Sequence, residues 1–326
     1  MKKSQFRAFF LVSILFIFVC TLPIISWAAG EKYPSRTIEV YCAFPAGSYT
    51  DLVVRALAKG LEKYLGGTVV VINKTGGGGV VANTALVNAR PDGYTLAATA
   101  VINIVSPLAL GHATYSLEDF YVIGQYSYST LSLAVHVDSP WKTFHEFLDY
   151  ERKNPGVKYG HQGIGSGPYI RMENLIRMAN LKMIGVPFKS DTEIVSALSG
   201  KHIPIGILTT TTAKIQEDGG QLRLLFSFDP PAKAGLSPNV PDILTVFGKG
   251  VADKDLNVLR VLIAPRKTPD EILKVLEQAL DNVTKDPEFV NTTKKLWGVS
   301  PEFVDSKKMM QLLPIYLSGV KGILKP

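Results

Sequence analysis

Cysteine is scarce in this sequence: the 326 residues include two, Cys20 and Cys42. Cys20 belongs to an N-terminal apolar run that we expect to be removed, which leaves Cys42 without a cysteine to pair with. Because Cys42 lies within the apolar run 38–44, we expect a buried thiol rather than a reactive one. The five histidines show no metal-ligand spacing. The sequence therefore disfavours a disulfide scaffold and a metal site, and we expect no cofactor.

Clustered positive charge is also missing. The formal net charge is +7, and removing residues 1–28, which hold the three bases Lys2, Lys3 and Arg7 and no acid, lowers it to +4. No stripe of Lys and Arg with interleaved aromatic residues occurs, so we expect no nucleic-acid partner. A mildly positive surface favours an anionic ligand.

Motifs for catalysis are absent as well. No Gly-x-Ser-x-Gly elbow occurs, and Ser48 and Ser166 have no local activating partner. The glycine spacing in Gly160–Gly167 is imperfect for a dinucleotide site, and Gly76–Gly79 lacks the Gly-Lys-Ser/Thr ending of a phosphate loop. We therefore predict that the protein is not an enzyme. An exported α/β enzyme whose titratable groups meet only in space stays open as an alternative.

Long apolar runs are confined to the N-terminus. Basic residues precede the run Ala8–Cys20, and Ser26 and Ala28 form the small-x-small pattern of a signal-peptidase site. We predict a signal peptide at residues 1–28, cleavage near Ala28, and a periplasmic mature chain. An uncleaved membrane anchor stays open. Later apolar runs, such as Val258–Ala264, have strand length.

The remaining pattern alternates strands and helices, which predicts an α/β fold with mostly parallel sheets. Two such halves, with the C-terminal part returning to the first, indicate a hinged two-lobe binding protein. We assign residues 29–130 and 229–326 to lobe 1 and residues 131–228 to lobe 2. The two hinge crossings are expected near Thr130 and Phe228.

One loop in each predicted lobe joins a strand to a helix, at Pro45–Asp51 and at Gly160–Tyr169. Ligands of such sheets bind beyond the carboxyl ends of the strands, where backbone N–H groups and the helix dipole attract anions. Two residues allow two interpretations. Asp51 is either a helix-capping acid or a ligand contact, and His161 either lines the cleft or occupies a solvated loop position.

The same loops carry a family resemblance. The chain resembles the extracytoplasmic receptors of tripartite tricarboxylate transporters, also called the Bug family, in segments whose order and spacing span nearly the whole mature chain. These segments are Tyr33–Ile38, Phe44–Gly47 with Thr50 and Asp51, Gly76–Gly78, Ala89–Thr95, Tyr159–Gly160, Val186–Lys189 and Pro238–Pro241.

The resemblance implies a two-lobe periplasmic-binding-protein fold of the type II, Venus-flytrap kind. Its cleft would take a small organic acid whose carboxylate is held largely by main-chain N–H groups and ordered waters. The implied partners are the membrane subunits of a tripartite transporter, and the receptor is expected to be a monomer. A subunit that presents ligand to a membrane sensor kinase is the alternative. The predicted ligand-binding residues are Ala46, Gly47, Ser48, Tyr49, Thr50, Asp51, Ala100, Asn103, His161, Gly163, Gly165, Ser166, Tyr169, Lys189 and Asp191.

Some positions depart from the family pattern. Tyr49 stands where the family has a small residue, and Pro168 and Tyr169 interrupt a loop that is usually rich in serine. The aromatic motif before the last strand is missing ahead of Leu256. The ligand is therefore expected to be a dicarboxylate or an aromatic carboxylate.

Overall fold

The computed structural model describes residues 33–248 and 256–324. Residues Arg36–Pro326 form one compact unit, to which the contacts below belong, and only residues 33–35 of the separate unit Met1–Ser35 are described. The predicted signal peptide and its cleavage site lie outside the described residues.

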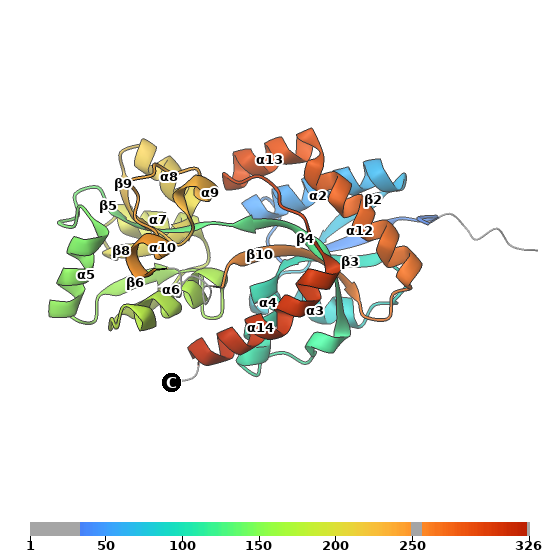
Figure 1. Cartoon of the computed structure of the whole chain (residues 1–326), viewed down its shortest axis with the longest axis horizontal. Helices are drawn as coiled ribbons and strands as arrows, with labels where there is room; N and C mark the ends of the chain where they lie inside the picture. The colour runs from blue at the N-terminus through green and yellow to red at the C-terminus, as the bar shows by residue number, and fades with distance from the viewer. Residues whose placement is uncertain (1–32, 249–255, 325–326) are drawn as a thin grey trace, which may run out of the picture. The chain divides into compact units, whose positions relative to one another are not determined.

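Two β-sheets organise the chain, with strand orders β11-β4-β10-β3-β1-β2 and β7-β6-β8-β5-β9 (Figure 1). The six-stranded sheet contains β1 (Ile38–Cys42), β2 (Val69–Asn73), β3 (Thr95–Ala100), β4 (Phe120–Ser129), β10 (Val258–Pro265) and β11 (Val304–Asp305). The five-stranded sheet contains β5 (Leu131–His136), β6 (Lys158–His161), β7 (Ile184–Pro187), β8 (Ile205–Thr209) and β9 (Leu222–Ser227). The predicted mixed α/β architecture is confirmed.

Helices connect most of the strands. In chain order they are α2 (Tyr49–Leu65), η1 (Gly77–Gly79), α3 (Val80–Val87), α4 (Val101–Ala109), η2 (Leu117–Asp119), α5 (Phe144–Lys153), α6 (Gly167–Met178), α7 (Asp191–Ser199), α8 (Thr210–Asp218), α9 (Pro231–Ala234), α10 (Ile243–Phe247), α12 (Asp270–Lys285), α13 (Pro287–Trp297) and α14 (Ser306–Leu324). Six of these, η1, α4, η2, α8, α9 and α10, were not predicted as helices. Most of α4 is buried, so it has no polar face to produce a helical period.

The parallel strands of the first sheet end at a common edge. β1 pairs in parallel with β2 and with β3, while β10 runs antiparallel between β3 and β4. Arg260 on β10 therefore pairs with Ala100, the last residue of β3. The carboxyl ends of β1 and β3 lead directly into the loops that open α2 and α4.

The second sheet repeats this arrangement. β6 pairs in parallel with β7 and β8, and β5 runs antiparallel between β8 and β9. The loop after β6 opens α6, and the loop after β7 opens α7. Each sheet thus provides helix N-termini beyond its parallel strands, as the strand-helix alternation predicts.

The chain changes sheets at two places. β4 of the six-stranded sheet ends at Ser129, and β5 of the five-stranded sheet begins at Leu131; a hinge at Thr130 stays a prediction. The return was expected near Phe228, with the first lobe resuming at residue 229. Residues 234–240 nevertheless pack with the five-stranded sheet, because Ala234 and Leu236 share a buried cluster with residues of α7 and β8. We therefore place the return later in the chain than the sequence pattern indicates.

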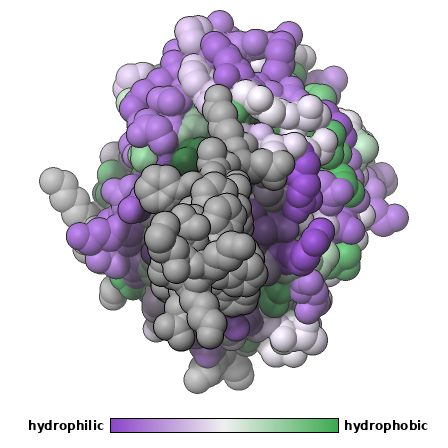
Figure 2. Space-filling model, turned by 90° about the vertical axis from the view of Figure 1, so that its right-hand side faces the viewer, coloured by the Kyte–Doolittle hydropathy of each residue, from purple (hydrophilic) through white to green (hydrophobic). Residues whose placement is uncertain are grey.

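The coloured residues on the face seen in Figure 2 are mostly hydrophilic, and the hydrophobic ones among them form small separate patches. Scattered apolar residues are ordinary on protein surfaces. Within residues 33–248 and 256–324, no helix combines the length and apolarity that membrane crossing requires.

Candidate ligand-binding site

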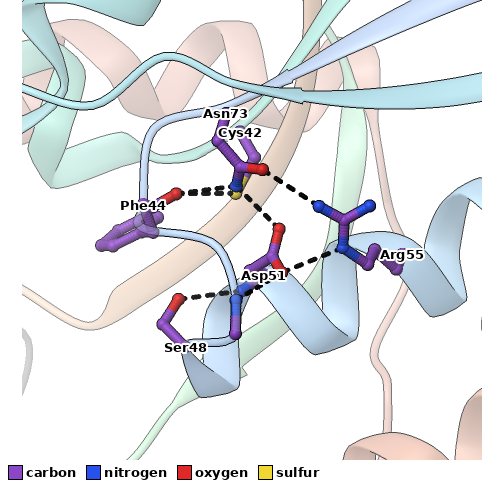
Figure 3. Close-up of polar contacts among 7 residues, drawn as sticks. Cys42, Phe44, Ser48, Asp51, Arg55 and Asn73 are labelled. Atoms are coloured by element: carbon purple, nitrogen blue, oxygen red, sulfur yellow. Dashed lines mark hydrogen bonds and ion pairs between the residues drawn. The ribbon is translucent and has the colours of Figure 1, made fainter.

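The loop after β1 is closed by the N-terminus of α2 (Figure 3). Ser48 is the N-cap, and its Oγ accepts a hydrogen bond from the backbone N–H of Asp51 at 3.2 Å. Gly47 has a φ of 79°, a left-handed conformation that favours glycine. Its N–H donates to Asp51 Oδ2 at 2.9 Å. The loop is therefore held to the first turn of its own helix.

Asp51 also ties this loop to the neighbouring strand β2. Its Oδ1 accepts a hydrogen bond from Asn73 Nδ2 at 2.7 Å, and its Oδ2 accepts one from Arg55 Nε at 2.9 Å. The residue is 1% exposed. Burial raises the pKa of the Asp51 carboxyl, but hydrogen bonds from Arg55, Asn73 and Gly47 outweigh this effect and the net pKa is lowered. The N-cap of α2 is thus Ser48, the Asp51 carboxylate is occupied by donors of the protein itself, and a ligand contact of Asp51 stays a prediction.

Two of the backbone N–H groups that we expected to face the ligand donate to acceptors of the protein itself. Gly47 uses its N–H on Asp51, and Ser48 uses its N–H on the carbonyl of Pro45 at 3.2 Å. The backbone N–H groups of Tyr49 and Thr50 belong to the first helical turn, where an α-helix provides no internal acceptor. Ala46 lies exposed in the loop, while the side chain of Tyr49 is outside the described part of the structure.

The loop after β6 has the same construction. Ser166 is the N-cap of α6, and its Oγ accepts from the N–H of Tyr169 at 3.2 Å. Gly163 and Gly165 have φ values of 92° and 81°. The N–H of Ser166 donates to the carbonyl of Gly163 at 3.2 Å, and Pro168 in the first turn has no N–H. The backbone N–H of Gly167, in the first turn of α6, is therefore the donor that this helix end can offer to a ligand.

This second loop lies against elements of the first sheet. A Cβ atom on Gly165 would approach Leu110 Cδ1 to 3.1 Å, and one on Gly167 would approach Val258 Cγ2 to 2.7 Å. A cavity of about 370 Å³ lies here between three segments of the chain, and its lining residues are Ile164, Gly165, Gly77, Gly78, Val80, Ser106, Pro107, Leu110 and His112. The hydroxyl of Ser106 is buried beside it and has no hydrogen-bond partner among the described residues.

Comparison with known proteins identifies the family. Residues 53–325 match the family described as tripartite tricarboxylate transporter family receptor. The chain belongs to this family. A UPF0065 protein of Cupriavidus necator, from the region 5′ of gbd, is 30% identical over 300 residues, which cover 91% of this chain and 89% of the relative.

Solved structures agree on the two-lobe fold of this receptor. The periplasmic binding protein BugD is similar with a TM-score of 0.75 and 23% identity, covering 89% of this chain and 97% of BugD. Rhodopseudomonas palustris MatC with bound malate has a TM-score of 0.74 and 22% identity, covering 90% and 100%. A second R. palustris protein, with adipate, has a TM-score of 0.74 and 20% identity, covering 89% and 97%.

His161 of the receptor is the last residue of β6 and is 1% exposed. The expectation of a solvated loop position for it is therefore wrong. Its ring lies between those of Tyr159 and Tyr169, with centroid distances of 5.4 and 4.8 Å. Burial lowers its pKa, although a hydrogen bond with the backbone of Gly163 acts in the opposite direction. The aromatic packing accounts for the burial, and contact with ligand stays a prediction.

The segment after β3 contributes backbone rather than side chains. Ala100 is fully buried and is the N-cap residue of α4. The carbonyl of Asn103 accepts a hydrogen bond from Asn83 Nδ2 at 3.0 Å. A Cβ atom on Gly79 would lie 3.0 Å from Asn103 Cβ. The glycine run thus lets the loop approach α4 closely.

The segment after β7 is also held internally. Lys189 is exposed, and its N–H donates to Glu193 Oε2 at 2.9 Å. Asp191 accepts from Gln162 Nε2 through Oδ1, and from the N–H and hydroxyl of Thr209 through Oδ2. Asp191 therefore connects β6, α7 and β8, much as Asp51 connects its loop to β2.

Two buried arginines of the receptor were missed by sequence reasoning. Arg171 on α6 donates to Asp229 Oδ2 at 2.9 Å, and Asp229 also accepts from the N–H of Leu131 at the first crossing. Arg260 lies on β10 and is 8% exposed. A single charged residue within the apolar run 258–264 was a signal that could have drawn attention to it. Among the described residues, no group of three or more His, Cys, Asp or Glu side chains could hold a metal ion.

Proposed function

We propose that this protein captures a small organic acid between its two lobes and delivers it to the membrane subunits of a tripartite tricarboxylate transporter. The observation that carries this proposal is the pair of matching loops: each follows a parallel strand, opens a helix of 12 residues or more and is closed by a serine N-cap. Such helix ends favour anions. Family membership supports the transporter as the destination.

We infer the class of ligand from the N–H donors at the helix ends and from the ligands of the similar solved structures. MatC holds malate and a second neighbour holds adipate, and both ligands are small dicarboxylates. We extend this class to the present chain and keep aromatic carboxylates within it, because Tyr169 lies half-buried at the second loop. The predicted contacts at Ala46, Gly47, Ser48, Tyr49, Thr50, Asp51, Ala100, Asn103, His161, Gly163, Gly165, Ser166, Tyr169, Lys189 and Asp191 are retained in this proposal, with Gly47 and Asp51 acting by ordering the first loop.

Binding without catalysis is the role that we propose. Asp51 and Asp191, the acids of the two regions, each accept several internal hydrogen bonds and are poorly placed to act as free bases. We further propose that the receptor acts in the periplasm as a monomer after removal of residues 1–28, because the N-terminal segment has the pattern of a signal peptide.

A thermal-shift screen tests the function. The mature chain is heated with malate, adipate or benzoate and, as a matched control, with the diamide of malic acid, which keeps the shape and lacks the charges. We expect at least one acid to raise the melting temperature, because a ligand at a hundredfold excess over its Kd stabilises the folded state by about 2.7 kcal/mol. Equal shifts from the acid and its diamide, or no shift with any acid, would contradict the proposal.

A further inference from the structure

Arg260 lies at the edge of the first sheet where the ligand loops begin. It pairs with Ala100, the last residue of β3, and with Ser127 on β4. Its guanidinium carbon is 5.3 Å from the ring centroid of Phe44, which follows the end of β1 by two residues. The antiparallel strand β10 thus brings a positive charge to the carboxyl ends of two parallel strands, where ligands of such sheets bind.

The contacts of this guanidinium are incomplete. Nε and Nη2 donate to the same hydroxyl, Ser129 Oγ, at 3.1 and 3.0 Å. The rings of Phe44 and Trp297 flank it at 5.3 and 5.2 Å from their centroids. Nη1 is buried and has no hydrogen-bond partner among the described residues. Two rings and one hydroxyl therefore contact the guanidinium, while the two N–H groups of Nη1 are not used.

The second buried arginine shows what complete pairing looks like in the same protein. Arg171 has a carboxylate partner, Asp229, at 2.9 Å and donates to the carbonyl of Phe228 at 2.8 Å. No ion pair within the described ranges includes Arg260. A buried charge without a counter-charge is unfavourable, so proteins pair such groups or use them.

A second donor on the same face also lacks a partner. The hydroxyl of Tyr126 is buried and has no hydrogen-bond partner in the described part of the chain. Its ring contacts Phe289 of α13, the helix that also supplies Trp297. Burial raises the pKa of Tyr126, so the phenol is a neutral donor at every physiological pH, and burial lowers the pKa of Arg260. The neutral phenol of Tyr126 therefore does not compensate the positive charge of Arg260.

We infer that Arg260 binds a carboxylate of the captured solute through Nη1 and supplies the formal positive charge of the ligand site. This inference rests on the proposed function and adds to it a charge that selects anions over neutral solutes. Helix-end N–H groups alone offer only partial charge. A guanidinium held by aromatic rings and one hydroxyl is already oriented, so little side-chain entropy is lost when a carboxylate reaches it.

Substitution of Arg260 by methionine and by lysine tests the inference. Arg260→Met removes the charge and keeps an apolar side chain between the two rings, and Arg260→Lys keeps a charge without the planar fork. Arg171→Met is the matched control, because it removes a buried arginine that already has its carboxylate. Unfolding temperatures are measured first without any organic acid, and then with formate, malate or adipate against equal ionic strengths of chloride.

Without acid, we expect Arg260→Met to melt at or above the wild-type temperature, because it removes an uncompensated charge, whereas Arg171→Met should melt lower. With the acid that stabilises the wild type most, we expect Arg260→Met to lose at least about tenfold in affinity and Arg260→Lys to retain part of it.

Two results would overturn the inference: an Arg260→Met variant that melts well below the wild type without acid, or one that binds the acid as tightly as the wild type. If no acid stabilises the wild type, the proposed function fails for these acids. The comparison without acid then decides separately whether Arg260 is an uncompensated charge.

Discussion

At the scale of single residues, Asp51 shows how a loop with few contacts of its own becomes ordered. Its two oxygens accept hydrogen bonds from a glycine N–H before it, an arginine after it and the side chain of Asn73 on β2. Hydrogen bonds to an ionised group are roughly twice as strong as neutral ones. The carboxylate therefore holds the loop in shape.

Asp51→Asn should destabilise the protein by about 1–3 kcal/mol at pH 7, because three donors lose an ionised acceptor. The folded-state pKa of Asp51 lies below its usual value of 3.8. Its stabilising effect is therefore fully present above that value and is lost as the pH falls through the folded-state pKa. Urea unfolding at pH 7, 5 and 3 should show the difference between variant and wild type shrinking toward acid pH.

The control for this substitution is Asp149→Asn. Asp149 is 72% exposed and faces Arg152 at 3.6 Å, a surface pair whose loss should change stability by less than about 1 kcal/mol. If Asp51→Asn and Asp149→Asn behave alike at all three pH values, Asp51 does not hold the loop in the manner described.

At the scale of elements, several helices begin with the same N-cap geometry, among them α2, α5 and α6. Ser48 on α2, Ser166 on α6 and Thr143 on α5 each accept a hydrogen bond at 3.2 Å from the N–H three residues later. Only the first two helices follow the proposed ligand loops. A comparison of variants at these three caps therefore separates the effect of a cap on stability from its effect on binding.

Replacement of each cap by alanine should destabilise the protein by a similar amount, about 1 kcal/mol. Ser48→Ala and Ser166→Ala should also weaken binding of the acid found in the thermal screen, because the loop that presents the helix N–H groups loses its anchor. Thr143→Ala should leave affinity unchanged. Calorimetric titration beside chemical unfolding measures both quantities. Equal affinity in all three variants would remove α2 and α6 from the site.

At the scale of the whole molecule, the two crossings between the sheets are the places where the lobes could move relative to each other. The first crossing is a single residue, Thr130, between β4 and β5. Beside it, the N–H of Leu131 donates to Asp229, which also pairs with Arg171. We propose that bending at the two crossings lets the lobes close on the ligand, as hinged binding proteins do.

Small-angle scattering should therefore give a smaller radius of gyration with the stabilising acid than without it. The diamide of malic acid serves as the control, because it should leave the radius unchanged. A radius that is the same with and without a saturating acid, shown to bind by calorimetry, would mean that the lobes do not close on the ligand.

Much of the local structure could be predicted from the sequence because it depends on neighbours within about four positions. The serines that cap α2 and α6, the glycines with positive φ and the alternation of strands and helices are all of this kind. They were sufficient to predict two α/β sheets and a candidate ligand loop in each. The family motifs, in their order along the chain, supported the same fold.

Pairings between distant segments were decided only by the tertiary structure. β10 inserts antiparallel between β3 and β4, and this sheet order alone brings Arg260 to the edge where β1 and β3 end. Arg171 meets Asp229 across 58 positions, and His161 is buried because Tyr159 and Tyr169 pack on it. Periodicity reports which face of an element is buried but not which element covers it. Neither the position of Arg260 nor the return of the chain to the first sheet could therefore be derived from the sequence by itself.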